Sequence, residues 1–519
     1  MKKLFYYVAS VLVLGLALNC SDEKSEEEKP GRNMFGHNIP RGLTITTEGL
    51  TPGYVLFSVP NSGSTYLVNR KGEVVHEWKG TYEGFNPYIM DDGSIMVGEN
   101  DVDYPVFGFG GPYGRIQKIS WDGKILWDYE LANEKHILHH DFALKPNGNI
   151  LAIVYEATSY DDALNMGRAP HLIPHSGPWL EKIIEIVPDG LHGAEIVWEW
   201  HVKDHLIQDY DESKPNFGDP ADHPELLSFN TGDTIPEAIS QDSLDALKAM
   251  GRESRNLTRF NPQSDIYHFN AISYNPTLEQ IAISSPELSE VLIIDQSTTT
   301  EEAATHEGGR SGKGGDFLYR WGNPENYHRG DSTNRRLWYQ HDVRWIEPGK
   351  PGAGNLTIFN NNVPNGPDTL DYTAVYELKS PIAASGTYEL REDGTYGPDE
   401  LEWNYVAHDT ISFYASFISG AHRMESGNTF INAGPMGRFF EVTPENDIVW
   451  EYLNPYRGNA TKPNGDPSNH MPMTYSTFRS TFIPANHPAL EGKELMPLDP
   501  QPEIYKMPPP PPEKKEESH

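Results

Sequence analysis

The chain has little cysteine and little positive charge. One cysteine among 519 residues means that no intrachain disulfide can form, so stability must come from packing. Only 41 residues are Lys or Arg against 75 Asp or Glu, which gives a formal net charge of -34. Nucleic-acid binding needs clustered cations that neutralise phosphates, so this balance argues against a nucleic-acid partner. It also disfavours anionic small ligands unless a local positive pocket opposes the overall field.

Long apolar runs are scarce as well, and the longest lies at the N-terminus. It covers residues 4–18, directly after Lys2 and Lys3. This run is too short to span a bilayer and is typical of a secretory signal peptide. The single cysteine, Cys20, follows at the position that a bacterial lipoprotein signal acylates. We therefore expect a signal peptide over 1–19 and a lipid anchor at Cys20, on the bacterial outer membrane, facing the periplasm or the cell surface.

Both ends of the mature chain have the composition of unfolded segments. Residues 20–42 begin with an acidic, apolar-poor run that cannot bury enough surface to fold, and we interpret them as a tether. Residues 496–519 end in a polyproline run followed by Glu and Lys, which is typical of a disordered tail. The intervening residues 43–495 are long enough for one large core.

A short pattern recurs six times between these ends. It consists of an aliphatic or apolar start, an aromatic residue that is mostly Trp, a polar residue and a second aromatic residue, at 74–78, 125–129, 196–200, 317–321, 401–405 and 448–452. Glycine turns precede several copies, so each copy is expected in the last hairpin of a small antiparallel sheet. Repeats of about 45 to 50 residues predict an all-β fold, a six-bladed β-propeller over 43–495 with a short helical insertion at 242–253 and disordered termini. Two unrelated sandwiches are the alternative.

Histidines recur at one position of the predicted inner strands. His140 lies eight residues before Gly148 and His341 eight before Gly349, while His268 begins the corresponding strand of the fourth repeat. The innermost strands of a propeller line its central channel, so these three histidines are expected to share one pocket. A single histidine is more simply explained as a core or rim imidazole, but three in one register favour a functional site.

The segments around these histidines resemble the bacterial arylsulfotransferases, six-bladed propellers that use a channel histidine as a covalent sulfuryl carrier. The segments are 138–149, 268–274, 340–342 and 437–443, and with the repeat spacing they cover about residues 45–495. The resemblance implies an enzyme without a cofactor or metal that moves a sulfuryl group from an aryl sulfate to a phenol. By motif, His341 would be the sulfurylated nucleophile, and His140, His268 and Asn270 would surround the sulfuryl oxygens.

One departure from the family concerns the cation on the sulfuryl group. The family carries an Arg where this chain has Pro286, and a guanidinium fork is a strong oxyanion donor. Arg310 or one of two other arginines could compensate from elsewhere. The further candidates for substrate binding are His139, His422, Arg423 and Arg344. For His422, three residues further along its strand, buried hydrogen bonding is the competing role.

Two other classes of function remain open on the sequence. Several histidines around a propeller axis also resemble the iron site of carotenoid-cleaving oxygenases, where Asp141 and Asp342 could add oxygen ligands, although those enzymes have seven blades and four histidines at one depth. The other class is a non-catalytic surface propeller that binds a glycan or a small ligand. The glycine-rich stretch 308–315 lacks the spacing of a phosphate-binding loop and is interpreted as a flexible connection. A homodimer is also left open.

Overall fold

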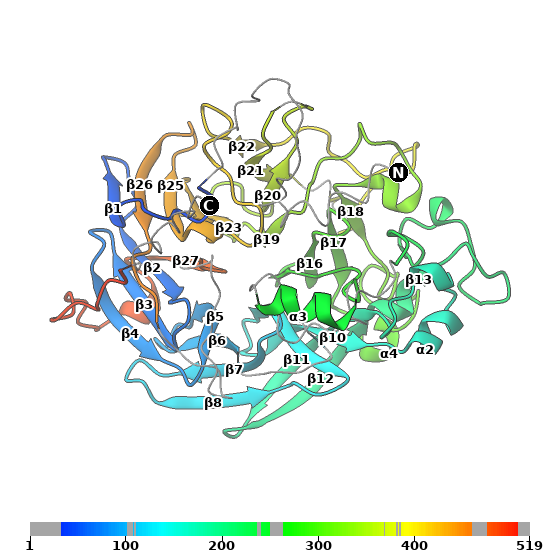
Figure 1. Ribbon diagram of the computed structural model, residues 1–519, viewed down its shortest axis with the longest axis horizontal. Helices are drawn as coiled ribbons and strands as arrows, with labels where there is room; N and C mark the ends of the chain where they lie inside the picture. Colours follow the sequence, from blue (N-terminus) through cyan, green and yellow to red (C-terminus); the bar gives the residue numbers. More distant parts are fainter. Residues whose placement is uncertain are drawn as a thin grey trace, which may run out of the picture.

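The protein folds into six antiparallel sheets that surround a central axis like the blades of a wheel (Figure 1). The computed structural model describes residues 33–100, 107, 111–235, 240–249, 263–367, 369–379, 382–383, 386–458 and 475–506. The arrangement confirms the predicted all-β, six-bladed β-propeller.

Each blade contains four strands, and the last blade gains a fifth. From the innermost strand outward, blade 1 comprises β27 (Ser480–Pro484), β2 (Gly53–Ser58), β3 (Ser64–Asn69) and β4 (Val74–Lys79). Blade 2 comprises β5 (Glu83–Ile89), β6 (Ile95–Asn100), β7 (Gly114–Ile119) and β8 (Ile125–Glu130). Blade 3 comprises β9 (His136–Leu144), β10 (Ile150–Ala157), β11 (Trp179–Asp189) and β12 (Gly193–His201).

The remaining blades follow the same order. Blade 4 comprises β15 (Ala271–Asn275), β16 (Gln280–Ser285), β17 (Glu290–Asp295) and β18 (Tyr319–Trp321). Blade 5 comprises β19 (His341–Trp345), β20 (Leu356–Val363), β21 (Tyr372–Leu378) and β22 (Trp403–Tyr405). Blade 6 comprises β23 (Gly420–Arg423), β24 (Thr429–Ala433), β25 (Arg438–Val442), β26 (Ile448–Leu453) and β1 (Gly42–Thr46).

Short helices occupy the connections between strands. The α-helices are α2 (Tyr160–Asn165), α3 (Gln241–Ala249) and α4 (Thr300–Ala303). The 3₁₀ turns are η1 (Pro170–Leu172), η2 (Val202–His205), η3 (Pro220–Asp222), η4 (Pro324–Tyr327), η5 (Gly434–Met436) and η6 (Pro488–Leu490). β13 (Leu206–Ile207) and β14 (Leu227–Ser228) form a small parallel pair. The sequence predicted a helix over 242–253; α3 covers the beginning of that range, and 250–253 lie outside the described residues.

Both ends of the chain close the ring. β27 pairs with β2 in blade 1, from Gly53 opposite Pro484 to Phe57 opposite Ser480. β1 pairs with β26 at the outer edge of blade 6. Figure 1 shows the blue N-terminal strands beside the orange and red C-terminal ones at these two junctions. Segments more than 400 residues apart therefore hold the wheel shut, which leaves only short outer edges.

The repeated pattern of the sequence occupies the fourth strand of every blade. Within the described part of the chain, most of its tryptophans bind the turn before the fourth strand of the next blade, or the start of that strand: Trp127 Nε1 to Gly193 O (2.8 Å), Trp198 to Thr298 Oγ1 (3.2 Å), Trp321 to Pro398 O (2.9 Å), Trp403 to Pro444 O (3.0 Å) and Trp450 to Arg70 O (3.0 Å). These indoles fasten blades 2 to 6 each to the next blade of the ring, which explains why the pattern recurs from blade to blade.

The packed chain extends past the predicted boundaries of the propeller. Arg41 donates to the carbonyl oxygen of Met436 (2.7 Å), ahead of β1. Near the other end, the amide of Leu498 donates to Val74 O (2.9 Å) on β4. The predicted signal peptide and the anchor at Cys20 lie outside the described residues and stay predictions. Among the described residues, no helix is long and apolar enough to cross a membrane.

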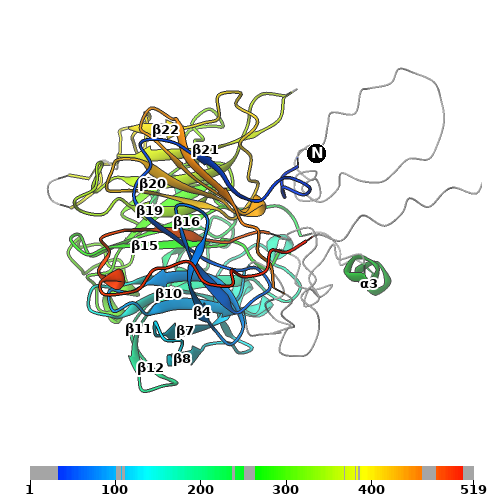
Figure 2. The same cartoon turned by 90° about the vertical axis from the view of Figure 1, so that its left-hand side faces the viewer.

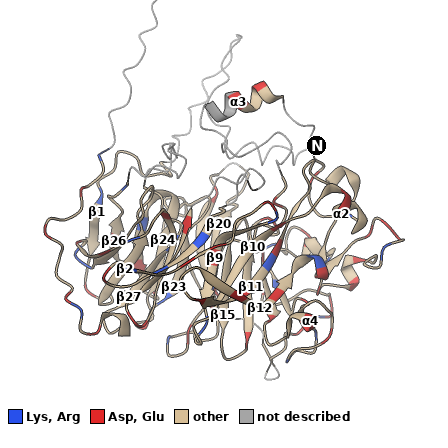
Figure 3. Cartoon of the chain, turned by 90° about the horizontal axis from the view of Figure 1, so that it is seen from below, with Lys and Arg blue, Asp and Glu red and all other residues tan. Residues whose placement is uncertain are grey.

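The insertion that carries α3 emerges between blades 3 and 4. A fourth strand ends on the face of the disc where the next inner strand begins, because the four strands alternate in direction. This insertion therefore belongs to the face at which β15 and β19 start. Figures 2 and 3 show α3 standing away from the strands on one side of the disc.

Candidate active site

Two of the three predicted histidines lie where inner strands depart from regular pairing, and the third, His268, lies just before its inner strand. The pairing of β9 with β10 shifts in register around His140, and the pairing of β19 with β20 shifts directly after His341. His140 (φ 52°), His268 (φ 51°) and Asp342 (φ 55°) adopt the left-handed region, which costs a non-glycine residue about 1–2 kcal/mol. Bulges of this kind re-aim side chains next to functional sites. Left-handed backbone thus occurs at His140 and His268 and directly after His341, on the inner segments of three blades.

The structure brings the three histidines together, as the register predicted. The rings of His140 and His268 are 4.4 Å apart at 71°. Burial, followed by the charge of His268 and those of other neighbours including His341, moves the pKa of His140 well below its usual value. The ring of Phe478, 6.0 Å from His140, contributes an apolar surface beside the cluster.

His341 has a fixed tautomer. Its Nδ1 faces two acceptors, Asn361 Oδ1 (3.0 Å) and the carbonyl oxygen of Tyr339 (3.2 Å). The Asn361 amide is oriented because its Nδ2 donates to the carbonyl oxygens of Ala415 (2.7 Å) and Ile418 (3.1 Å). Nδ1 of His341 therefore carries the proton and Nε2 carries the lone pair. Burial and the charges of Arg479 and His268 lower the pKa of His341 to about 3, so the ring is neutral.

His268 has the opposite electrostatic environment. Its Nδ1 lies 2.5 Å from Asp265 Oδ2, which also accepts a hydrogen bond from the Tyr155 hydroxyl (2.6 Å). Burial lowers the pKa of His268, but the charge and hydrogen bond of Asp265, with the charge of Glu287, outweigh burial and raise it above the usual value. His268 is thus the histidine of the cluster that favours the imidazolium form.

A chain of buried groups stands behind His140. His139 Nδ1 lies 2.8 Å from His140 Nδ1, and His139 Nε2 lies 2.8 Å from Glu181 Oε2. The other oxygen of Glu181 accepts the amide hydrogen of Phe269 (2.8 Å). The ring of His139 stacks on Tyr155 at 3.5 Å, which fixes its plane.

Burial favours the neutral form of all three groups of this chain. Burial, then the charge of Asp265, raises the pKa of Glu181 well above its usual value. Burial likewise moves the pKa of His139 well below its usual value. The carboxyl group of Glu181 then donates to His139 Nε2, and His139 Nδ1 donates to His140 Nδ1. His140 is left with its proton on Nε2, so that nitrogen is a hydrogen-bond donor. His139 acts through His140 and is a positioning residue.

A glycine allows the neighbouring loop to approach His140. Gly111 has φ +72°, and a Cβ there would lie 2.7 Å from His140 Nε2. The backbone amide of His140 donates to Gly111 O (3.0 Å). A side chain at this position would have to displace the imidazole.

Two buried aspartates connect the inner strands beneath the histidines. Asp141 accepts from the Tyr88 hydroxyl (2.5 Å) and from Asn86 Nδ2 (3.0 Å). Asp342 pairs with Arg344 Nε (2.9 Å) and lies 3.4 Å from Arg479 Nε. These contacts use the carboxylates for tying blades together. They give no support to the hypothesis that Asp141 and Asp342 complete a metal site with the histidines.

Two arginines near the cluster were not found from the sequence. Arg479, 1% exposed, precedes β27 and donates through Nη2 to the carbonyl oxygen of Asn270 (3.0 Å). Its charge lowers the pKa of His140 and His341. The closing inner strand β27 lies at the far end of the chain, so its residues carry no local signal of the site.

Arg335 lies at the turn that contains Pro286. Its Nη2 donates to Ser289 Oγ (2.7 Å), and the amide of Ser289 donates to Pro286 O (3.0 Å). The amide of Tyr339, two residues before His341, also points at Ser289 Oγ (3.3 Å). Arg335 therefore brings a guanidinium to the turn where the family carries its Arg.

Asn270 and Arg344 lie in the cluster but use their polar groups on the protein. Asn270 Nδ2 donates to the carbonyl oxygen of Gln340 (3.0 Å) and so ties blade 4 to blade 5. Arg344 Nη2 contacts the Tyr88 hydroxyl at 3.2 Å, in the layer of the two aspartates. Neither contact directs a donor at the lone pair of His341.

His422, Arg423 and Arg310 are engaged elsewhere. His422 Nε2 accepts the amide hydrogen of Phe482 (3.1 Å), the buried hydrogen bond that was its competing role. Arg423 pairs with Glu377, and its guanidinium lies over the ring of Trp403. Arg310 pairs with Glu279 (2.6 Å) beyond the end of β15, at the disc face opposite to His268.

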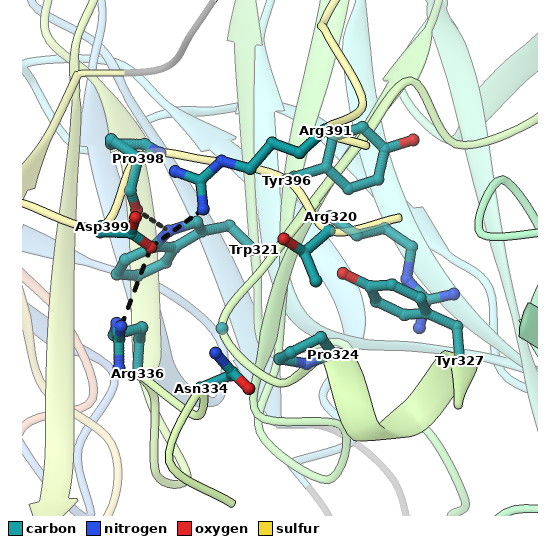
Figure 4. A pocket seen from close by; sticks show the side chains of 12 residues that line it. Arg320, Trp321, Pro324, Tyr327, Asn334, Arg336, Arg391, Tyr396, Pro398 and Asp399 are labelled. Carbon is teal, nitrogen blue, oxygen red and sulfur yellow. Dashed lines mark hydrogen bonds and ion pairs between the residues drawn. The ribbon is translucent and has the colours of Figure 1, made fainter. Parts of the chain in front are cut away.

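A pocket away from the axis is visible at the outer part of blades 4 and 5 (Figure 4). Two of the arginines that line it, Arg336 and Arg391, reach the same carboxylate, Asp399 Oδ1, at 3.8 Å and 3.0 Å. None of the channel histidines lines this pocket. Its charges are satisfied internally, and we assign it no ligand.

Comparisons with known proteins place the chain in a family. A search of curated protein sequences found no match. Solved structures of similar architecture include a protein of unknown function from Bacteroides caccae, 12% identical, with 78% of this chain and 94% of that chain covered at a TM-score of 0.39. A streptogramin B lyase structure is 12% identical, with 86% and 96% covered at a TM-score of 0.35. Likenesses this distant carry no argument about activity.

The family model is informative. The model described as Arylsulfotransferase (ASST) matches residues 40–454, which include the three axial histidines and five of the six complete blades. The chain belongs to the arylsulfotransferase family.

Proposed function

We propose that the protein transfers a sulfuryl group from an aryl sulfate to a phenolic acceptor through a covalent adduct on Nε2 of His341. The observation that carries this proposal is the locked tautomer of His341. Asn361 and the Tyr339 carbonyl hold the proton on Nδ1, and the low pKa keeps the ring neutral. A neutral imidazole with a directed lone pair is the form that can act as a nucleophile.

The first half-reaction uses His341 and His268. The Nε2 lone pair of His341 attacks the sulfur of the donor, and the bond between sulfur and the aryl oxygen breaks. The leaving phenolate takes a proton from the imidazolium of His268, which Asp265 stabilises. His341 then carries the sulfuryl group, and His268 is neutral.

The second half-reaction returns both groups to their first state. The oxygen of the acceptor phenol attacks the sulfur, its proton passes to His268, and the bond between Nε2 and sulfur breaks. His341 regains its lone pair and His268 its positive charge. Because His268 gives one proton and takes one back, the cycle needs no cofactor.

Donors around the sulfuryl oxygens complete the proposal. His140 presents an N–H from Nε2 because the neutral chain through His139 and Glu181 fixes its tautomer. Arg335, at the Pro286 turn, supplies the cation that the family residue would supply, while Arg479 contributes charge from beneath. Preorganised donors of this kind stabilise the charge that spreads over the equatorial oxygens.

The test is an assay of the full chain in detergent with 4-nitrophenyl sulfate and a phenol. We expect repeated turnover of nitrophenolate release that requires both the acceptor and His341, and, when the acceptor is withheld, one equivalent of release together with an adduct of one sulfuryl group per chain. His341→Ala should abolish both signals, whereas His422→Ala, which removes a half-buried histidine whose Nε2 is bonded to the amide of Phe482, should retain the adduct. Release that is equal in the wild type and His341→Ala would reject the proposal, and saturable binding without release would favour the non-catalytic propeller.

A further inference from the structure

Three metal-ligating side chains converge at the outer edge of the wheel, away from the axial site. His205 ends η2, directly after the outermost strand of blade 3, while His306 and Asp316 flank the glycine-rich segment 308–315, which lies between β17 and β18 of blade 4. One ligand atom from each residue lies within 4.8 Å of the other two. In the described part of the chain, no other group of three His, Cys, Asp or Glu donors meets that separation.

Both histidines aim the same ring nitrogen at one carboxylate oxygen. His205 Nδ1 and His306 Nδ1 each lie 2.8 Å from Asp316 Oδ1. His205 Nε2 lies 2.8 Å from the carbonyl oxygen of Ala303. A carbonyl oxygen can only accept, so Nε2 of a neutral His205 carries the proton and Nδ1 presents a lone pair to Asp316.

A lone pair facing a carboxylate is unfavourable unless a positive charge lies between the two. A proton that makes His205 a buried imidazolium is one such charge, and a metal ion is the other. The remaining contact of His205 is the one that metal-ligating histidines make, an N–H donated to a backbone carbonyl that fixes the ring and its tautomer.

The surroundings hold the His205 ring in one place. The ring is fully buried and stacks on Trp200 at 3° between planes. Trp200 Nε1 donates to the carbonyl oxygen of Gly315 (2.7 Å). A Cβ at Gly315 would lie 2.5 Å from His205 Nε2, so the glycine is required for the close approach of the loop. His306, with its side chain 62% exposed, leaves the group open to solvent on the other side.

We propose that His205 Nδ1, His306 Nδ1 and Asp316 Oδ1 bind one Zn²⁺ ion, with water in the fourth position. Two imidazoles and a carboxylate are a donor set that suits zinc. Ligands about 2.0–2.2 Å from a tetrahedral ion lie about 3.3 Å from one another, so Asp316 and the exposed His306 would move apart by about 0.5 Å. The ion would fasten the glycine-rich connection of blade 4 to the end of blade 3, a structural role separate from the proposed sulfuryl transfer.

The experiment measures Zn²⁺ bound to the metal-free full chain by calorimetric titration and by elemental analysis after dialysis. We expect one equivalent in the wild type and a thermal midpoint that rises with Zn²⁺. His306→Ala and Asp316→Asn should lose this equivalent and the rise. His223→Ala should lose neither, because it removes a half-exposed histidine that contacts a single carboxylate, Glu225, at 3.0 Å.

A second arm separates this group from the histidines on the axis. His341→Ala should keep the bound equivalent of Zn²⁺, since His341 lies on the innermost strand of blade 5 and η2 follows the outermost strand of blade 3. Retention of the full equivalent by His306→Ala, or no binding by the wild type, would overturn the proposal and leave a buried imidazolium at His205. Loss of the equivalent in His341→Ala alone would move the metal to the axial site.

Discussion

The low pKa of His341 predicts that the rate of the first half-reaction stays nearly constant on the acid side of its pH profile. An ordinary imidazole with a pKa of about 6.5 is about 3% neutral at pH 5. With its pKa at about 3, His341 is about 99% neutral at that pH. The nucleophile therefore loses almost nothing between pH 7 and pH 5, where the neutral, reactive form of an ordinary histidine would fall about 25-fold.

The alkaline limb should reflect His268. The leaving phenolate needs the proton of its imidazolium, and Asp265 raises the pKa of that ring above the usual value. We therefore expect the rate to fall only as the pH rises through the raised pKa of His268, and Asp265→Asn should move this fall to lower pH. The direction follows because removal of a carboxylate next to an imidazolium favours the neutral ring.

The assay is a single turnover with excess enzyme, quenched into alkali so that all released nitrophenol is read as the anion. A rate that declines about 25-fold from pH 7 to pH 5 would refute the assigned environment of His341. Folding must be followed at each pH by tryptophan fluorescence. Below about pH 6.5 the unfolded chain binds a proton at His341 that the folded chain does not. The free energy of unfolding therefore decreases as the pH is lowered, by about 2 kcal/mol for this residue at pH 5.

Two further pairs of substitutions test the neutral chain through His139 and Glu181 and the tryptophan hydrogen bonds between blades. Glu181→Gln should keep kcat/KM within a few-fold of the wild type, because an amide can still donate to His139 Nε2, whereas Glu181→Ala should lower it strongly; an equal loss in both would mean that the carboxylate charge is required. Trp450→Phe should lower the free energy of unfolding by about 1–3 kcal/mol in urea, since it leaves a carbonyl unpaired. Trp78→Phe is the matched control with the smaller expected loss, because the Trp78 indole N–H has no hydrogen-bond partner in the described chain.

The fold could be predicted because its signals are local. The aromatic fourth strands and their glycine turns recur within the length of one hairpin, so the blade count follows from counting copies. The closing strand β27 has no such mark. It is recognised only by its pairing with β2, more than 400 residues away in the chain. Local sequence patterns carry no information on pairing over such a distance.

The three histidines could be predicted for a similar reason, and their partners could not. The spacing from a turn glycine places His140 and His341 at matching depths, and the structure brings them together with His268. The groups that set their protonation, among them Glu181, Asp265 and Asn361, come from neighbouring strands or loops and bear no register relation to them.

The regular pairing of β23 explains why His422, on that strand, has a different role from the histidines of the cluster. β23 pairs with β24 without a register shift, in contrast to β9 and β19. Without a bulge, His422 keeps the ordinary alternation of a strand and points at the backbone of β27. The histidines of the cluster lie at or next to left-handed residues and His422 does not, a difference of backbone conformation that composition cannot reveal.

The balance of buried charge at the axis bears on the kind of ligand that it can hold. Arg344 and Arg479 face Asp141 and Asp342, and the imidazolium of His268 faces Asp265. These charges pair off, while the chain as a whole carries a net charge of -34. An anionic donor therefore gains little from the long-range field and must be held by short-range donors.

In the proposed mechanism such donors are of two kinds, the guanidinium of Arg335 at the Pro286 turn and the N–H of neutral His140. A neutral donor costs less to bury than a second cation, and it does not raise the positive charge around the lone pair of His341. The neutral state of the chain through His139 and Glu181 thus serves the same end as the low pKa of His341. Both keep the buried site in the protonation states that the proposed sulfuryl transfer requires.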